Sequence, residues 1–151
     1  MTSTLMPPVK SEGSAAVPES ARAFAAVALA AVSWDGVLTA AGSRALRHAL
    51  DYREPFCSLG IQATGELVDS LLGDLRRSGA QQLMLTSARA LSVQQRRIAF
   101  AVATEIMRSD GPLEADERNI LASLADTLDL PAEEATRIYD VMDLLHGDIT
   151  G

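Results

Sequence analysis

Two acidic turns carry the side chains whose types and spacing could do chemistry in this chain. Asp35-Gly36 follows an apolar run in the first half, and Asp110-Gly111 follows a second apolar run, with Glu117 seven residues after the aspartate. Carboxylate oxygens are the ligands that Ca²⁺ and Mg²⁺ prefer in proteins. If the two turns lie together, Asp35, Asp110 and Glu117 could hold such a divalent cation, with water completing its coordination. The sequence therefore predicts a candidate metal site at these three residues.

The second turn resembles only the latter half of an EF-hand calcium loop. Gly111 and Glu117 stand at the sixth and twelfth loop positions, but Ile106 and Arg108 stand where the first two oxygen ligands belong. In the first turn, the position that corresponds to Glu117 is Gly42. Because a calcium ion needs six or more oxygen ligands, an EF-hand is excluded.

A purely structural interpretation of the same acids stays open. Thr39 and Glu114 hold corresponding positions, and each is predicted to be the N-cap of the helix that follows its turn. Glu117 would then be the third helical residue, where a glutamate accepts a hydrogen bond from the N-cap amide. Asp110 could cap its own turn, and Gly111 supplies the backbone angle that the turn needs.

No catalytic constellation is visible. Cys57 is the single cysteine, and His48 and His146 do not show zinc-ligand spacing with it. The phosphate-loop, GxSxG and HExxH motifs are absent. We therefore expect no enzyme activity, and Cys57 as a nucleophile is the weakest of three hypotheses. A single cysteine fits a reducing compartment, so we expect a cytoplasmic location.

The net charge of −7 is concentrated in the last third of the chain. Residues 1–109 carry 11 bases and 9 acids, whereas residues 110–151 carry 2 bases and 11 acids. An acidic third repels nucleic acid, and it suits either a cation, a basic protein partner or simple solubility. No run reaches the roughly 18 apolar residues that a membrane-spanning helix needs. Any membrane association is expected to be peripheral and through a partner.

Helical signals cover almost the whole chain and predict an all-α fold of about seven helices. Residues 1–17 are expected to be a disordered leader, and 148–151 a short tail. Thr64 is predicted to cap the third helix, and Ser92 the fifth, in a capping box with Gln95. The expected helices cover about 18–32, 39–52, 64–78, 80–90, 92–108, 114–128 and 131–146, with 56–62 as a loop or short turn.

The chain repeats one helical hairpin, at residues 26–50 and 99–124. Superposing the two Asp-Gly pairs places Leu46 on Leu121. Duplicated hairpins often pack about a pseudo-twofold axis, so we expect two hemispheres that bury helices 18–32 and 92–108 against each other. Such packing would bring the two turns towards a shared region, with segment 80–90 joining the halves.

Residues 99–134 resemble the TerB-like family of tellurite-resistance proteins, which includes the N-terminal region of the DjlA-type membrane co-chaperone. The shared pattern is an alanine-rich helix, Asp-Gly-x-Leu, a glutamate seven residues after the aspartate, and a helix ending in Leu-x-Leu-Pro. It is matched by Asp110, Gly111, Leu113, Glu117, Leu121, Leu128, Leu130 and Pro131. Asp35, Gly36 and Leu38 match in the first copy, while Gly42 departs from the expected glutamate.

The resemblance covers about residues 20–147 and implies a non-enzymatic, duplicated helical domain over 18–147. It implies acidic residues gathered at a divalent-metal site, and a role in tellurite-type stress response or in an envelope-associated assembly with a protein partner. The alternative is a metal-independent protein–protein adaptor, similar to the co-chaperone domain, whose groove between hemispheres receives a partner helix. The oligomeric state is left open by the sequence.

Overall fold

The computed structural model describes residues 17–109 and 111–150, which form helices and no strand. The all-α prediction is confirmed. Within residues 17–109 and 111–150 there is one helix more than expected, because α4 is a single turn inside segment 56–62. The expected leader, apart from Val17, lies outside the described residues. The helices are α2 (Glu19–Val32), α3 (Ala40–Asp51), α4 (Phe56–Leu59), α5 (Ile61–Ser78), α6 (Ala80–Ala88), α7 (Val93–Arg108), α8 (Ala115–Thr127) and α9 (Ala132–Leu145).

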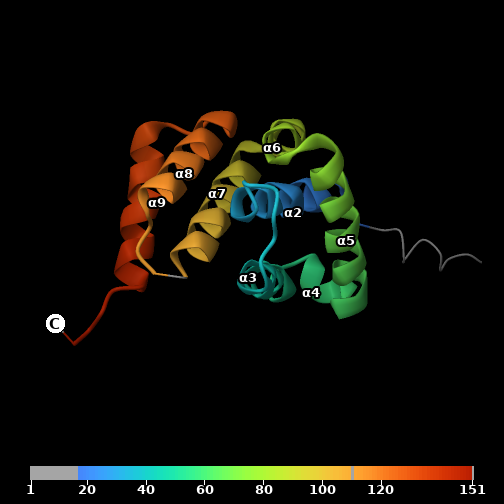
Figure 1. Cartoon of the computed structure of the whole chain (residues 1–151), viewed down its shortest axis with the longest axis horizontal. Helices are drawn as coiled ribbons and strands as arrows, with labels where there is room; N and C mark the ends of the chain where they lie inside the picture. The colour runs from blue at the N-terminus through green and yellow to red at the C-terminus, as the bar shows by residue number, and fades with distance from the viewer. Residues whose placement is uncertain (1–16, 110, 151) are drawn as a thin grey trace, which may run out of the picture.

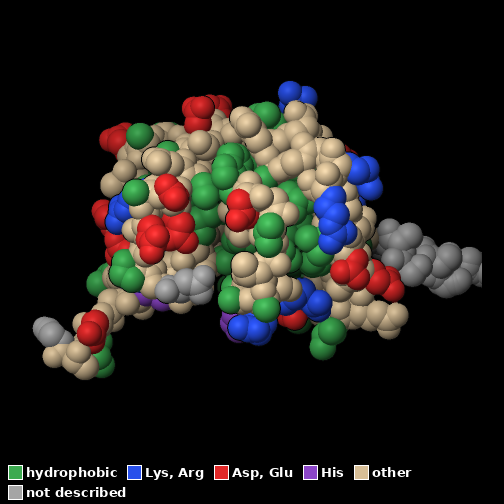
Figure 2. Space-filling model, viewed as in Figure 1, with side chains coloured by type: hydrophobic (Ala, Val, Ile, Leu, Met, Phe, Trp, Pro, Cys, Tyr) green, Lys and Arg blue, Asp and Glu red, His purple; other side chains and the backbone are tan. Residues whose placement is uncertain are grey.

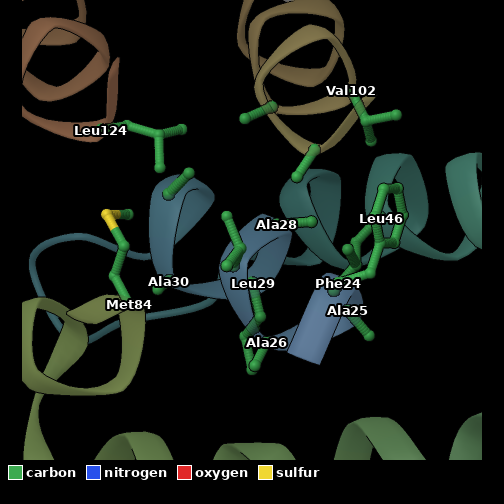
Figure 3. Close-up of a cluster of buried hydrophobic side chains, with 14 of the residues drawn as sticks. Phe24, Ala25, Ala26, Ala28, Leu29, Ala30, Leu46, Met84, Val102 and Leu124 are labelled. Atoms are coloured by element: carbon green, nitrogen blue, oxygen red, sulfur yellow. The ribbon is translucent and has the colours of Figure 1, made fainter. Parts of the chain in front are cut away.

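Helix α2 lies at the centre of the molecule, with α3 to α5 on one side and α7 to α9 on the other (Figure 1). Ten of its 14 residues are buried, most of them alanines. Small side chains let neighbouring helices approach closely, and Figure 3 shows Leu46, Met84, Val102 and Leu124 converging on α2 from four other helices. The first helices of the two hairpins do pack together, as predicted.

Helix α6 does more than join the two halves. It makes more extensive contacts with α2 than α7 does, and it buries Leu83 and Met84. The repeat could not indicate this contact because α6 has no counterpart in the second half. Helix α2 is therefore enclosed by α6 as well as by its own duplicate.

The predicted caps are correct at three helices and wrong at one. Glu114 is the N-cap of α8, where it forms a capping box with Glu117. The Thr39 hydroxyl accepts the Gly42 N–H at 3.0 Å, and Ser92 forms its capping box with Gln95. Helix α5, however, begins at Ile61 and not after Thr64. Thr64 is fully buried within the first turn of α5, where its hydroxyl donates to the Phe56 carbonyl of α4 at 3.4 Å. Gly60, four residues earlier, takes the N-cap position.

Helix α9 is the least buried of the longer helices, with Ala135 as its one buried residue. It packs on α7, where the Tyr139 and Phe100 rings lie 5.8 Å apart. Burial in this contact raises the pKa of Tyr139, although the nearby Arg118 charge opposes the shift. None of the described helices has the length and hydrophobicity that crossing a membrane requires.

Candidate acidic cleft

A cleft of about 550 Å³ lies between the α2–α3 turn and helices α7 and α8. Asp35 lines it from the first hairpin, and Asp116 and Glu117 line it from the second. The remaining wall mixes aliphatic side chains, among them Ile106 and Ile120, with polar ones such as Asn119. The structure therefore places two of the three predicted metal ligands, Asp35 and Glu117, on one cleft. The third, Asp110, lies outside the described residues.

Glu117 has the capping role that its position predicts. Its Oε1 accepts the Glu114 N–H at 3.0 Å, one turn earlier in the chain. A carboxylate at this end of α8 is also stabilised by the helix dipole. Asp116, the residue before Glu117 in the first turn of α8, also lines the cleft, and it was not among the predicted metal ligands. Because Asp116 directly precedes Glu117 in the chain, the sequence could have indicated that it also lines the cleft.

Asp35 shapes its own turn. Its Oδ1 accepts the Val37 N–H at 3.1 Å, and Gly36 between them has a φ of +88°. Gly111 in the second turn also has a positive φ, +128°. Because residues with a side chain rarely adopt such angles, both turns depend on their glycines. The duplication thus extends to the backbone of the turns.

The described side chains do not form a ready-made chelating group. Among residues 17–109 and 111–150, no three Asp, Glu, His or Cys side chains are grouped closely enough to hold a metal ion. Gly42 lines the same cleft, and a Cβ built there would lie 3.1 Å from Thr39 Oγ1. The position is therefore crowded by the cap of α3. The cleft therefore contains carboxylates from two hairpins, and these described carboxylates are not grouped around one point.

Away from the cleft, the surface charge has the distribution that the sequence predicts, with acidic side chains concentrated in the last third of the chain. On the face shown in Figure 2, acidic side chains gather over α8 and α9, and several basic ones lie over α5. Arg96 and Arg97 have structural contacts: Arg96 Nε donates to the Ala88 and Leu91 carbonyls, and Arg97 Nε lies 2.6 Å from Glu134 Oε2. These two arginines hold α6 and α9 against α7.

The cysteine and the two histidines have separate surroundings. Cys57 is exposed on α4. His146 Nε2 lies 2.6 Å from Glu105 Oε1, and the His48 ring packs 5.9 Å from that of Tyr52. Each histidine thus has a partner of its own, on α7 or α3.

A second and more apolar groove, of about 790 Å³, lies between α3 and α7 and reaches the end of α9. We call it the α3/α7 groove. Small and aliphatic side chains line it, among them Ala45, Ala49 and Val102. Tyr52 lines it too and is 65 % exposed. A groove between hemispheres was predicted, but its residues were not, because they depend on how α3 packs against α7.

Comparisons with known proteins leave the family a matter of resemblance. No family model, curated protein or solved structure matches this chain. The resemblance to the TerB-like family is therefore based on the residues of the acidic turn and of the helices around it. What that family implies about metal and partners stays a prediction.

Proposed function

We propose that the protein is a non-enzymatic, TerB-like binding module that responds to a divalent cation, Ca²⁺ or Mg²⁺, bound in the acidic cleft. The observation that supports this is the arrival of Asp35, Asp116 and Glu117 at one cleft from two separate hairpins. A cation between them would link the hairpins. The module would act with a protein partner in a stress response of the tellurite type or in an envelope-associated assembly.

The local hydrogen bonds are compatible with this role. Glu117 uses Oε1 for its cap, and Asp35 uses Oδ1 for its turn. A carboxylate has two oxygens, so the second oxygen of each can bind a cation while the first keeps the backbone contact. Water would supply most of the remaining ligands, as is usual for Mg²⁺. The cation would also offset repulsion within the acidic third of the chain.

Thermal unfolding with and without cation tests the proposal. A cation that binds only the folded state, at 100 times its Kd, stabilises by about 2.7 kcal/mol. For a domain of this size that raises the Tm by roughly 5 to 10 °C. We expect such a rise in millimolar CaCl₂ or MgCl₂. An unchanged Tm in both salts would contradict the proposal.

Glu117→Gln is the informative variant. An amide oxygen can still accept the Glu114 N–H, so the cap is kept while the charge is lost. We expect a near-normal Tm without cation and a much smaller rise with it. Asp126→Asn is the matched control, since Asp126 is an exposed acid of the same helix that does not line the cleft. Equal losses in the two variants would indicate nonspecific screening in place of a site.

The metal-independent adaptor is the second candidate, and the α3/α7 groove is the observation that favours it. An adaptor would capture its protein partner equally well in chelator and in cation. Capture would be lost in Tyr52→Ser, which removes the exposed ring from the groove, and kept in Glu117→Gln. The opposite pattern would favour the cation-responsive module.

A further inference from the structure

We propose that the α3/α7 groove receives the C-terminal segment of a second copy of this chain, so that two copies pair reciprocally. The C-terminal segment is Asp140–Thr150, the last turns of α9 and the residues that follow. This proposal does not depend on the cation site. It goes beyond the adaptor hypothesis by naming the occupant of the groove.

The groove has the form of a helix-binding surface. Along α3, Arg44, His48 and Tyr52 recur every four residues, so they form one edge of the groove. Ala45 and Ala49, one position further on, leave room between α3 and α7. Small residues between two helices, with larger ones at the rim, allow a third helical or extended segment to lie between them.

The C-terminal segment carries large apolar side chains that are mostly exposed in the single copy. Val141 is 51 % exposed, Leu144 81 %, Leu145 68 % and Ile149 97 %. These are four of the nine large, exposed apolar side chains in the described part of the chain, and Tyr52 across the groove is a fifth. Clustering of this kind marks an interaction surface, whereas single exposed apolar residues do not.

The charges of the groove and the segment are complementary. The α3 side of the groove carries Arg44 and Arg53 together with His48. The C-terminal segment contains three aspartates and no lysine or arginine. Asp140 is exposed and lies one turn before Leu144, so a charge and an apolar side chain share one face of α9. Asp143 already pairs with Arg108 of its own copy, and Glu105 on the α7 side of the groove pairs with His146. The complementarity is therefore between Asp140 and Asp148 of the segment and the basic α3 side of the groove.

The end of α9 is held so that a second copy can reach it. Arg108 Nε donates to Asp143 Oδ1 at 2.8 Å, and His146 lies against Glu105, which fixes the last turn on α7. Leu145 then borders its own groove, while Leu144 stays exposed. Because the groove and the segment are neighbours, a twofold axis near the end of α9 would place each segment in the other groove. Every contact would be made twice.

Sedimentation equilibrium of the full chain tests the proposal. We expect a mass that rises with concentration to twice the 16.0 kDa of one chain. Leu144→Asp removes one apolar contact from each half of the interface and should weaken pairing by at least about 100-fold. Ile61→Asp is the matched control, because Ile61 is 77 % exposed on α5 and lies outside the groove. Circular dichroism melts should show both variants folded.

A charge exchange sharpens the test. Arg44→Glu and Asp140→Arg should each weaken pairing, and the double variant should recover most of it. A single mass of 16.0 kDa up to millimolar concentration would overturn the proposal. So would pairing that Leu144→Asp leaves unchanged. Pairing that appears only after deletion of residues 1–16 would identify those residues as the occupant, and would equally overturn it.

Discussion

The two helical hairpins follow one sequence pattern in two different environments. Helix α2 buries ten of its 14 residues, whereas its counterpart α7 buries seven of 16. Ala30 and Glu105 hold matched positions five residues before the aspartate of each turn. Ala30 is 0 % exposed, while Glu105 reaches outward to His146. The duplication thus repeats helix, turn and leucine contacts, and the surrounding helices decide which faces can be polar.

Exchanging that matched pair should give the largest effect. Ala30→Glu would bury a carboxylate in the hydrophobic core, and we expect a loss of about 3 to 5 kcal/mol of unfolding free energy or failure to fold. Glu105→Ala removes one partly exposed contact and should cost less than about 1 kcal/mol. Urea denaturation followed by circular dichroism measures both. Similar losses would contradict the central position of α2.

Leucines at corresponding positions of the two hairpins should instead lose similar amounts of unfolding free energy when they are truncated. Leu46 in α3 and Leu121 in α8 are 1 % and 0 % exposed, and they correspond in the duplication. Truncation of either to alanine leaves a core cavity, for which we expect a loss of about 2 to 5 kcal/mol. The same urea titrations compare them. A negligible effect at one of the two would show that the duplication is confined to sequence.

The caps should give the smallest effects. Thr39→Ala loses the bond to the Gly42 N–H, and Glu117→Ala loses the bond to the Glu114 N–H; we expect each to cost about 1 kcal/mol. Two different side chains would then contribute equally to the start of α3 and α8. Thr39→Ser is the control that keeps the hydroxyl and should cost little. A loss in Thr39→Ser as large as in Thr39→Ala would assign the effect to packing of the methyl group.

The features that the sequence predicted correctly involve residues close together in the chain or belong to the repeated hairpin. The periodicity of apolar residues gave the helices, and Thr39, Ser92 and Glu117 were correctly placed at helix starts because capping involves neighbours in the chain. Thr64 was misassigned because its partner, the Phe56 carbonyl, belongs to a contact between two helices. A one-turn helix such as α4 is too short for a periodic signal.

The candidate site shows the same division. The duplication indicated that the two acidic turns converge, and Asp35 and Glu117 do line one cleft. The α3/α7 groove was predicted only as a space between hemispheres. Its lining comes mainly from α3 and α7, with Met142 and Leu145 added by α9, and the packing of helices that are distant in sequence leaves no trace in local periodicity.

The burial of α2 has a consequence for synthesis on the ribosome. Its principal partners, α6 and α7, begin at Ala80 and Val93, so about 60 residues separate the end of α2 from the start of α7. At roughly 5 to 20 residues per second, the ribosome needs about 3 to 12 s to make them. During that interval the most apolar of the described helices has been made but does not yet have both of its principal packing partners. The helix at the centre of the core is therefore made well before the helices that cover it.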